Sequence, residues 1–393
     1  MYSNIIKSSL GSVRVSNIFY LLYFVLLTKP YSIQAYPLVE TSWDILCILI
    51  SVFYGFRLLA RFEVDRPLIL LCMFCLLYCM LTCANNPERL LGAISESLRI
   101  IMMYWTVMHL CRLHHESGLR VISICYSLIL YADAGSILYS VAVFGFDSTY
   151  SLLGYDNNAI FDIIPMLTIV FYSAYSRLRA YGMNSNILLI LCIACKVLTG
   201  AATSMLALML FAVSLFIIRF SKSILNMINI KSALMIVVVS TIGLAFLHIE
   251  RYFTWLFNLL GKDVTLSYRT VIWEHSIEAI VNQPLGYGKT GNGIFQQLTG
   301  FSPLYDLAAN HTHNYALELL FVSGIPGTVI YLLFLIDVAV KCKYTKQTSI
   351  LLAGVVAYSI LMITDSYLFI ASFYALLAIL ASTQLITRID NTK

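Results

Sequence analysis

The sequence predicts an all-α, polytopic integral membrane protein of about twelve transmembrane helices, with one large outward-facing loop. Three observations lead to this prediction. Apolar residues make up 60% of the chain and charged residues only 11%, whereas soluble domains carry about a quarter charged residues. Apolar runs recur at close to the ~20 residues that span a bilayer. The basic residues lie in short clusters between those runs. Lipid is therefore the expected solvent for most of the exterior.

The predicted spans follow one another along the chain with short connections. They cover 13–28, 42–60, 67–84, 92–111, 121–144, 158–176, 185–198, 202–219, 232–248, 315–338, 347–364 and 366–386. The seventh and eighth are short and could form a tight re-entrant pair. No small-residue cleavage site follows the first, so we expect it to stay as an anchor.

The positive charges predict the orientation. Alternate connections hold Lys7 and Arg14; Arg57, Arg61 and Arg66; Arg112 and Arg120; Arg177 and Arg179; Arg219, Lys222 and Lys231; Lys341, Lys343 and Lys346; Arg388 and Lys393. The opposite connections hold far fewer, among them Lys29 and Arg89. Because short cytoplasmic loops carry the Lys/Arg excess, both termini are expected in the cytoplasm. The absence of a continuous basic stripe argues against nucleic-acid binding.

The long connection, 249–314, then falls on the outer side of a single membrane domain spanning 1–393. It contains an apolar face formed by Ile272, Trp273, Ile277, Ile280 and Val281, which predicts an amphipathic helix on the membrane or over a cavity. Glycines and Pro284 mark a turn-rich stretch after it. Loops of this length in compact proteins are usually functional or disordered, and the aromatic and apolar content favours function.

Several polar residues of this loop suit chemistry on a charged substrate. Arg269 shares a helix face with Trp273, and its guanidinium could bind a diphosphate or extend to lipid headgroups. His311 and His313 close the loop; either could act as a general base or be structural. His-x-His with Glu318 nearby could also ligate zinc, but the further Cys or His that zinc prefers does not adjoin them in the sequence. We therefore predict no metal and no cofactor.

Four stretches together resemble the O-antigen ligase and polymerase superfamily of bacterial envelope polysaccharide assembly. They are Ser267-Tyr268-Arg269-Thr270-Val271-Ile272-Trp273, Gln283-Pro284-Leu285-Gly286-Tyr287-Gly288, His313-Asn314-Tyr315-Ala316-Leu317-Glu318-Leu319-Leu320 and Gly324-Ile325-Pro326-Gly327. The run Asp156-Asn157-Asn158-Ala159 resembles a further patch of these proteins. The family often has an arginine at the outer junction of helices seven and eight, which the ligases are thought to need. Ala202 stands there, which favours a polymerase.

The resemblance implies a glycosyltransferase in the bacterial inner membrane, with its active site on the periplasmic face. Such an enzyme moves a glycan from undecaprenyl diphosphate to an acceptor hydroxyl. It implies His313 as the base and Arg269 as the cation that stabilises the leaving group. The further substrate-binding candidates, for diphosphate or glycan, are Arg251, His311, Lys196, Trp273, Tyr287 and Asn314. Asn314 is also an expected N-cap.

Charged residues within the predicted spans are candidates for function. Glu96 and Arg99 lie three positions apart and could simply pair with each other. Asp133 and Asp162 could be catalytic, or could pair with Lys196 or accept backbone N–H bonds.

Two alternatives share the predicted architecture. A ligase would pass the finished glycan to lipid A–core. A transporter or flippase of lipid-linked oligosaccharide would place its charged residues near the midplane and often show an internal repeat. No convincing repeat is present, and the polar groups concentrate in one outer loop, so an enzyme is favoured. The implied partners are a lipid-linked oligosaccharide, membrane lipid, and the chain-length regulator and flippase of the same pathway.

Overall fold

The computed structural model describes residues 15–59, 64–113, 115–145, 151–154, 158–178, 180–220, 230–246, 269–291, 295–297 and 311–390. Within these ranges every regular element is helical. The loop predicted over 249–314 is therefore described only in part. Arg251, Asp156 and Asn157, which the sequence analysis named, lie outside the described residues.

Each predicted span coincides with a helix. The helices are α2 (Val15–Thr28), α3 (Pro37–Leu59), α4 (Arg66–Asn85), α5 (Leu90–Leu113), α6 (His115–Phe144), α7 (Ile160–Leu178), α8 (Met183–Leu198), α9 (Ala202–Phe220), α10 (Ile230–Thr241), α14 (Tyr315–Lys341), α15 (Thr348–Thr364) and α16 (Ala371–Asp390). A π-helical turn, η4 (Ile242–Phe246), continues α10, and short 3-10 turns lie at Tyr31–Ala35 (η1) and Pro87–Arg89 (η2). The predicted outer-loop helix is α12 (Arg269–Asn282).

Six described helices, α3, α4, α5, α6, α9 and α14, are long and apolar enough to cross a membrane, and five shorter apolar helices accompany them. Large apolar side chains on their outer faces are exposed, as Phe53 (74%) and Phe56 (70%) on α3 illustrate. An exterior of this kind needs lipid around it. The protein is therefore an integral membrane protein, while the count of twelve spans stays a prediction.

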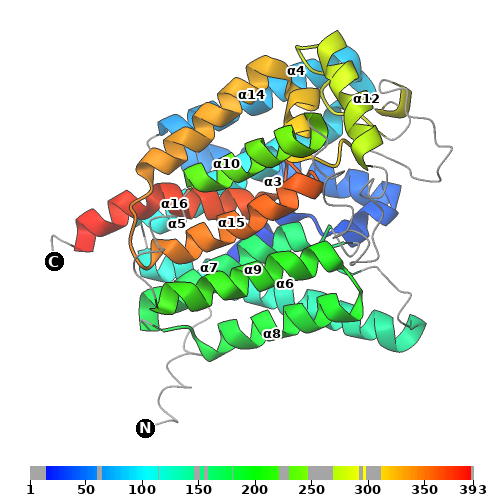
Figure 1. The fold of residues 1–393 in the computed structure, drawn as a ribbon. Helices are drawn as coiled ribbons and strands as arrows, with labels where there is room; N and C mark the ends of the chain where they lie inside the picture. The colour runs from blue at the N-terminus through cyan, green and yellow to red at the C-terminus, as the bar shows by residue number, and fades with distance from the viewer. Residues whose placement is uncertain are drawn as a thin grey trace, which may run out of the picture.

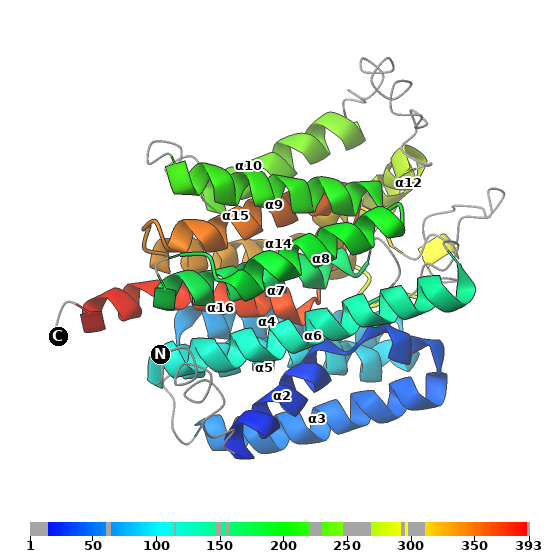
Figure 2. The same cartoon turned by 90° about the horizontal axis from the view of Figure 1, so that it is seen from below.

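The long helices lie side by side in one bundle (Figures 1 and 2). In its interior, α7 is buried at every position from Ile160 to Ala174, and α16 packs against α5, α7 and α14. The end of α16 and the outer-loop helix α12 lie at opposite ends of the bundle (Figure 1). The bundle thus has one end that carries α12 and one that does not.

Basic residues predicted to face the cytoplasm meet acidic partners at the end away from α12. Asp65 lies 3.0 Å from Arg112 Nη2 and 2.7 Å from Lys341 Nζ. The Arg66 guanidinium lies 3.4 Å from Asp337. These contacts bring three predicted inner connections together, as the charge pattern requires. Which side of the membrane they face stays a prediction.

Two of the glycine-containing stretches, 283–288 and 324–327, pack together and hold α12 against α14. The segment after α12 runs along a kink in α14 at Gly324, with Tyr287 N–H donating to Phe321 O and Gly288 N–H to Val322 O, both at 2.9 Å. Gly286 has φ +93°, and a Cβ there would overlap the backbone nitrogen of Gly324. Only glycine allows this backbone approach. The motifs therefore fix where α12 and Arg269 sit.

Candidate active site

The loop before α14 is held by its own polar side chains. Asn314 caps α14, its Oδ1 accepting from Ala316 and Leu317 N–H at 3.1 Å each. Its amide nitrogen donates to Thr241 Oγ1 and to the Ile363 carbonyl, both at 3.1 Å. His313 has φ +51°, a left-handed conformation uncommon for a residue other than glycine. The loop therefore presents its two histidines in one fixed arrangement, and Asn314 acts as the expected N-cap.

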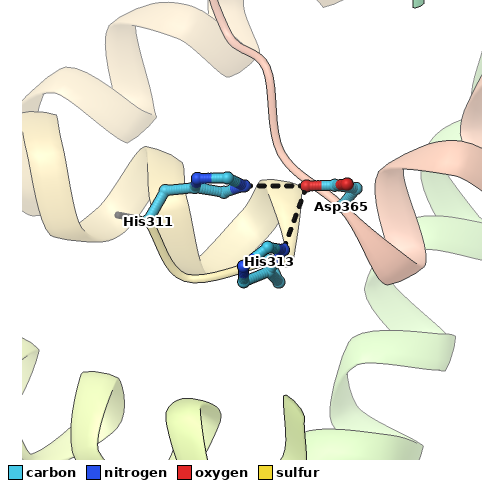
Figure 3. A group of neighbouring side chains, drawn as sticks. All are labelled: His311, His313 and Asp365. Carbon is cyan, nitrogen blue, oxygen red and sulfur yellow. Dashed lines mark hydrogen bonds and ion pairs between the residues drawn. The ribbon is translucent and has the colours of Figure 1, made fainter. Parts of the chain in front are cut away.

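Both histidines face one carboxylate, Asp365, from the connection between α15 and α16 (Figure 3). His311 Nε2 lies 2.8 Å from Asp365 Oδ1, and His313 Nδ1 lies 3.2 Å from the same oxygen. The two imidazole centroids are 4.0 Å apart. Ser366 N–H also donates to Asp365 Oδ1, at 2.9 Å. We call His311, His313 and Asp365 the His–Asp cluster.

The cluster separates the pKa values of its two histidines. Burial acts to lower the pKa of His311, but the hydrogen bond and negative charge of Asp365 outweigh it, so that pKa is raised. Burial and then the charge of His311 lower the pKa of His313. Burial alone would raise the pKa of Asp365, but its contacts with the two imidazoles hold it well below the ordinary value. At neutral pH, Asp365 is ionised and His313 is the histidine that stays neutral.

Arg269 lies on one side of the cluster. It lines a small cavity together with Asp365 and with Thr203 and Ser204 at the start of α9, and its charge acts on both histidines. Among the described residues it makes no hydrogen bond or ion pair. A cation in such a position can accept an anionic ligand next to His313.

A larger polar cavity of about 260 Å³ lies on the other side of the cluster. His311 lines it together with residues of six helical elements and of the loops between them. The charged residues in its wall are Lys29, Glu96, Arg99, Asp162, Lys289 and Glu318. Aromatic rings of Tyr31, Tyr78, Tyr367 and Phe369 complete the lining. The His–Asp cluster thus stands between a small cavity with one arginine and a larger one with both signs of charge.

A family model described as O-antigen ligase matches residues 187–332. The matched segment contains α12, both histidines and Arg269. The chain is therefore similar to the O-antigen ligase family over this segment, which is less than half of its length. No curated protein and no solved structure matches the chain. The match confirms the resemblance seen in the sequence, and it does not separate ligase from polymerase.

Two of the predicted substrate-binding residues, Trp273 and Tyr287, are packed inside the protein. Trp273 is fully buried, in a cluster with Ala245 and Leu317. The Tyr287 ring stacks on Phe321 with centroids 4.8 Å apart, and its hydroxyl donates to the Ala279 carbonyl at 2.9 Å. Neither ring has an open face here, and both hold α12 against α14.

Lys196 is placed away from the cluster. It is 1% exposed on α8 and acts electrostatically on Asp133 of α6. It lines neither of the two polar cavities. Asp133 also accepts the Leu153 N–H at 2.8 Å, so the alternative of backbone bonding and pairing describes these two residues well.

The structure adds residues that the sequence did not single out. Asp365 lies 52 positions beyond His313. Its place at the predicted outer end of a span was the one feature of the sequence that put it near the two histidines. A Glu96–Arg99 pair, suggested by their spacing, does not form, because Glu96 instead pairs with Lys289 from the glycine-rich stretch. That leaves Arg99 in the wall of the larger cavity.

The His–Asp cluster also has the composition of a metal site. One ligand atom from each of its three members lies within 4.8 Å of the others, and two histidines with a carboxylate are common zinc ligands. The third member is Asp365 rather than Glu318, whose Oε2 accepts the Thr312 N–H at 2.8 Å. The same contacts are those of two imidazoles oriented by a carboxylate, which is the arrangement that base catalysis requires.

Proposed function

We propose that this protein is a polymerase of lipid-linked polysaccharide repeat units, in the bacterial inner membrane with its site facing the periplasm. The observation that carries the proposal is the meeting of three groups at the end of the bundle that holds α12. They are a neutral histidine, a buried carboxylate and an arginine without an ion pair in the part of the chain that the structure describes. The reaction would transfer a glycan from undecaprenyl diphosphate to a hydroxyl of an acceptor repeat unit.

The proposed step is a displacement at the anomeric carbon of the donor glycan. The acceptor oxygen forms the new bond to that carbon, the bond from carbon to phosphate oxygen breaks, and lipid diphosphate leaves with the electron pair. The hydroxyl proton goes to His313. The contact between Nδ1 and Asp365 favours the tautomer with its proton on Nδ1, which leaves Nε2 as the accepting atom.

The electrostatics support His313 rather than His311 as the base. A general base must be unprotonated at the working pH, and the lowered pKa of His313 meets this condition. His311, with its raised pKa and its hydrogen bond to Asp365, is suited to orient the carboxylate and the acceptor. General-base assistance contributes about 10²–10⁴-fold in rate.

Arg269 is the proposed partner of the departing diphosphate. Fixed positive charge aimed at the place where negative charge develops is often a large part of catalysis. Arginine binds phosphate oxygens in a bidentate fashion. Arg269 and Asp365 line the same small cavity, so the leaving group bound by Arg269 would lie next to the base.

The α8–α9 junction bears on the choice between polymerase and ligase. Thr203 and Ser204 line the cavity that holds Arg269, so the neighbouring position 202 lies close to the proposed diphosphate site. The resemblance places an arginine of the ligases there, and this chain has Ala202. This absence favours the polymerase, with the O-antigen ligase as the second candidate. A flippase is less favoured because the sequence shows no convincing internal repeat and the His–Asp cluster with Arg269 lies at one end of the bundle.

The test is a gel of surface polysaccharide from the source bacterium. It compares the intact gene, a deletion, and His313→Ala expressed at normal level. The expected result is lipid A–core bearing a single repeat unit in both the deletion and the variant. The matched control is His275→Ala, because His275 lies on α12 and lines neither polar cavity; it should leave the long chains intact.

Two results would contradict the proposal. If lipid A–core carried no repeats while long lipid-linked polymer accumulated, the protein would be a ligase. If His313→Ala produced normal polysaccharide, His313 would not be the base. Equal losses in His313→Ala and His275→Ala would point to a folding defect, and membrane levels of each variant distinguish that case.

A further inference from the structure

The larger cavity contains a buried arginine with no hydrogen-bond or ion-pair partner among the described residues. Arg99, on α5, is 7% exposed, and its Nε is buried without a hydrogen-bond partner. Among the described residues its guanidinium makes no hydrogen bond and no ion pair. Burial of an uncompensated charge is costly. The charge of Arg99 acts on Glu96 and Asp162, and its guanidinium donors can in addition bind an anionic ligand in the cavity.

The other cations of the cavity are already neutralised. Lys29 lies 3.0 Å from Glu40 and 2.9 Å from Asp44, and Lys289 is paired with Glu96. Within the described lining, Arg99 is therefore the cation left for a ligand, and it would accept a single negative charge.

The remaining carboxylates suit a ligand rich in hydroxyl groups. One oxygen of Asp162 accepts from the Ser372 hydroxyl at 2.6 Å, and one oxygen of Glu318 accepts from the Thr312 N–H at 2.8 Å. The second oxygen of each carboxylate accepts no hydrogen bond from the described residues. Carboxyl oxygens accept hydrogen bonds, so each can bind a sugar hydroxyl. The Tyr367 and Phe369 rings also line the wall, with Phe369 stacked on Tyr78.

The size of the cavity agrees with such a ligand. One water takes about 30 Å³ in the liquid, so about 260 Å³ corresponds to roughly nine waters, comparable with a sugar ring. The cavity reaches His311 at one end of its lining. A sugar bound there would have its hydroxyl groups next to the His–Asp cluster.

We propose that the cavity around Arg99 binds an acidic sugar, a hexuronate-type residue of the acceptor glycan, with its carboxylate on Arg99 and its hydroxyls on Asp162 and Glu318. This inference rests on the proposed function, because it assigns the larger cavity to the acceptor and the Arg269 cavity to the donor. It specifies the substrate as a glycan that carries a carboxylate.

A diphosphate fits this cavity less well. It carries more than one negative charge and no hydroxyl groups, and it would lie against Asp162 and Glu318 with only Arg99 unpaired. A hexuronate carries one charge, which Arg99 matches, and several hydroxyl donors, which the two carboxylates match. The charge pattern of the wall therefore favours a sugar carboxylate over a phosphate.

Binding of free sugars to the purified full-length protein in detergent tests the proposal. The probes are D-glucuronate and D-glucose, which differ only at the C6 carboxylate, and inorganic pyrophosphate; binding is followed by the rise in melting temperature with concentration. D-Glucuronate should bind, and D-glucose more weakly. Arg99→Gln should weaken D-glucuronate binding at least about tenfold, because a charge-assisted bond is lost. The matched control is Arg89→Gln, at an exposed arginine outside the cavity.

The outcomes separate this inference from the proposed function. Unchanged D-glucuronate binding in Arg99→Gln, or equal binding of the two sugars, would overturn it. So would pyrophosphate binding that depends on Arg99 and not on Arg269. Loss of polymer in His313→Ala without Arg99-dependent sugar binding would support the polymerase and reject the acidic-sugar site. Arg99-dependent binding with normal polymer in His313→Ala would support the acidic-sugar site and reject His313 as the base of the proposed polymerase.

A stability measurement guards against a folding explanation. Arg99→Met keeps the apolar volume and removes the buried charge, so the melting temperature without ligand should stay equal or rise. It should lose the D-glucuronate response. A large fall in the melting temperature of Arg99→Met without ligand would show that the arginine has a structural role, and would overturn the inference.

Discussion

Charged residues gather at both ends of the bundle, and two pairs of cations, one pair from each end, differ in whether they make ion pairs. At the end away from α12, Arg112 and Lys341 share Asp65. At the end that carries α12, Arg99 and Arg269 make no ion pair within the described residues. Pairing offsets the desolvation of a buried cation and stabilises the fold. An unpaired cation beside a cavity is instead available to a ligand.

This contrast gives the two ends separate roles. The group at the end away from α12, which we call the inner group, connects α4, α5 and α14. It marks the side that the positive charges predict as cytoplasmic. The group at the end that carries α12, which we call the outer group, surrounds the His–Asp cluster. Substitutions at the inner end should therefore change stability, and substitutions at the outer end should change turnover or ligand binding.

The largest expected effect is that of Arg269→Gln. Removing a fixed cation from the leaving-group side should lower the transfer rate by about 10²–10³-fold, while the melting temperature stays close to that of the wild type. Polymer formed by membranes from a lipid-linked repeat unit measures the rate. Arg89→Gln, at an exposed outer arginine, should leave it unchanged. A normal rate in Arg269→Gln would remove this arginine from the proposed step.

The inner end should show the opposite behaviour in Asp65→Asn. The substitution keeps a side chain able to cap α4, where Asp65 now accepts the Leu68 N–H. It removes the charge shared by Arg112 and Lys341, at a cost of up to about 3 kcal/mol in the free energy of unfolding. The melting temperature should fall, with activity per folded molecule unchanged. Glu116→Gln, an exposed acidic position, serves as the control. Lost turnover at normal stability would contradict the division between the ends.

The sequence predicted the helices well because a membrane makes strong demands on composition. Each of the twelve apolar runs coincides with a helix, since a spanning segment must satisfy its backbone internally. The amphipathic helix was also correctly predicted, although Val281, assigned to its apolar face, is 72% exposed. Period and hydropathy decide helices locally, whereas the faces of a short loop helix depend on what packs against it.

The site was predictable only in its local part. His313 and Arg269 lie in recognisable stretches, and the structure brings them together around Asp365. Asp365 itself and the cavity role of Arg99 depend on contacts between distant helices. Spacing of three on a helix suggested that Glu96 and Arg99 pair, but Lys289, 193 positions beyond Glu96, takes that place. Ion pairs between distant parts of the chain decide which charges remain free, and a single sequence does not show which residues pair.

The smallest expected effect, and the most specific to the cluster, is a change in the pH profile of His311→Gln. In the wild type, the rate should fall with acid as His313 becomes protonated, at a pH below the ordinary histidine value, because burial and the charge of His311 lower the pKa of His313. Glutamine removes that charge and frees more of the Asp365 charge for His313. Both changes raise the pKa of His313, so the acid limb should move to higher pH.

The experiment measures transfer rate against pH in membranes from wild type, His311→Gln and His275→Gln, with only the first variant expected to shift. If the limb did not move, the titrating group would not be His313. If His311→Gln lost all activity at every pH, His311 would carry the proton, and its raised pKa would then place the acid limb above the ordinary histidine value in the wild type. The position of the wild-type limb therefore decides between the two histidines, because their shared carboxylate and their mutual repulsion move the two pKa values in opposite directions.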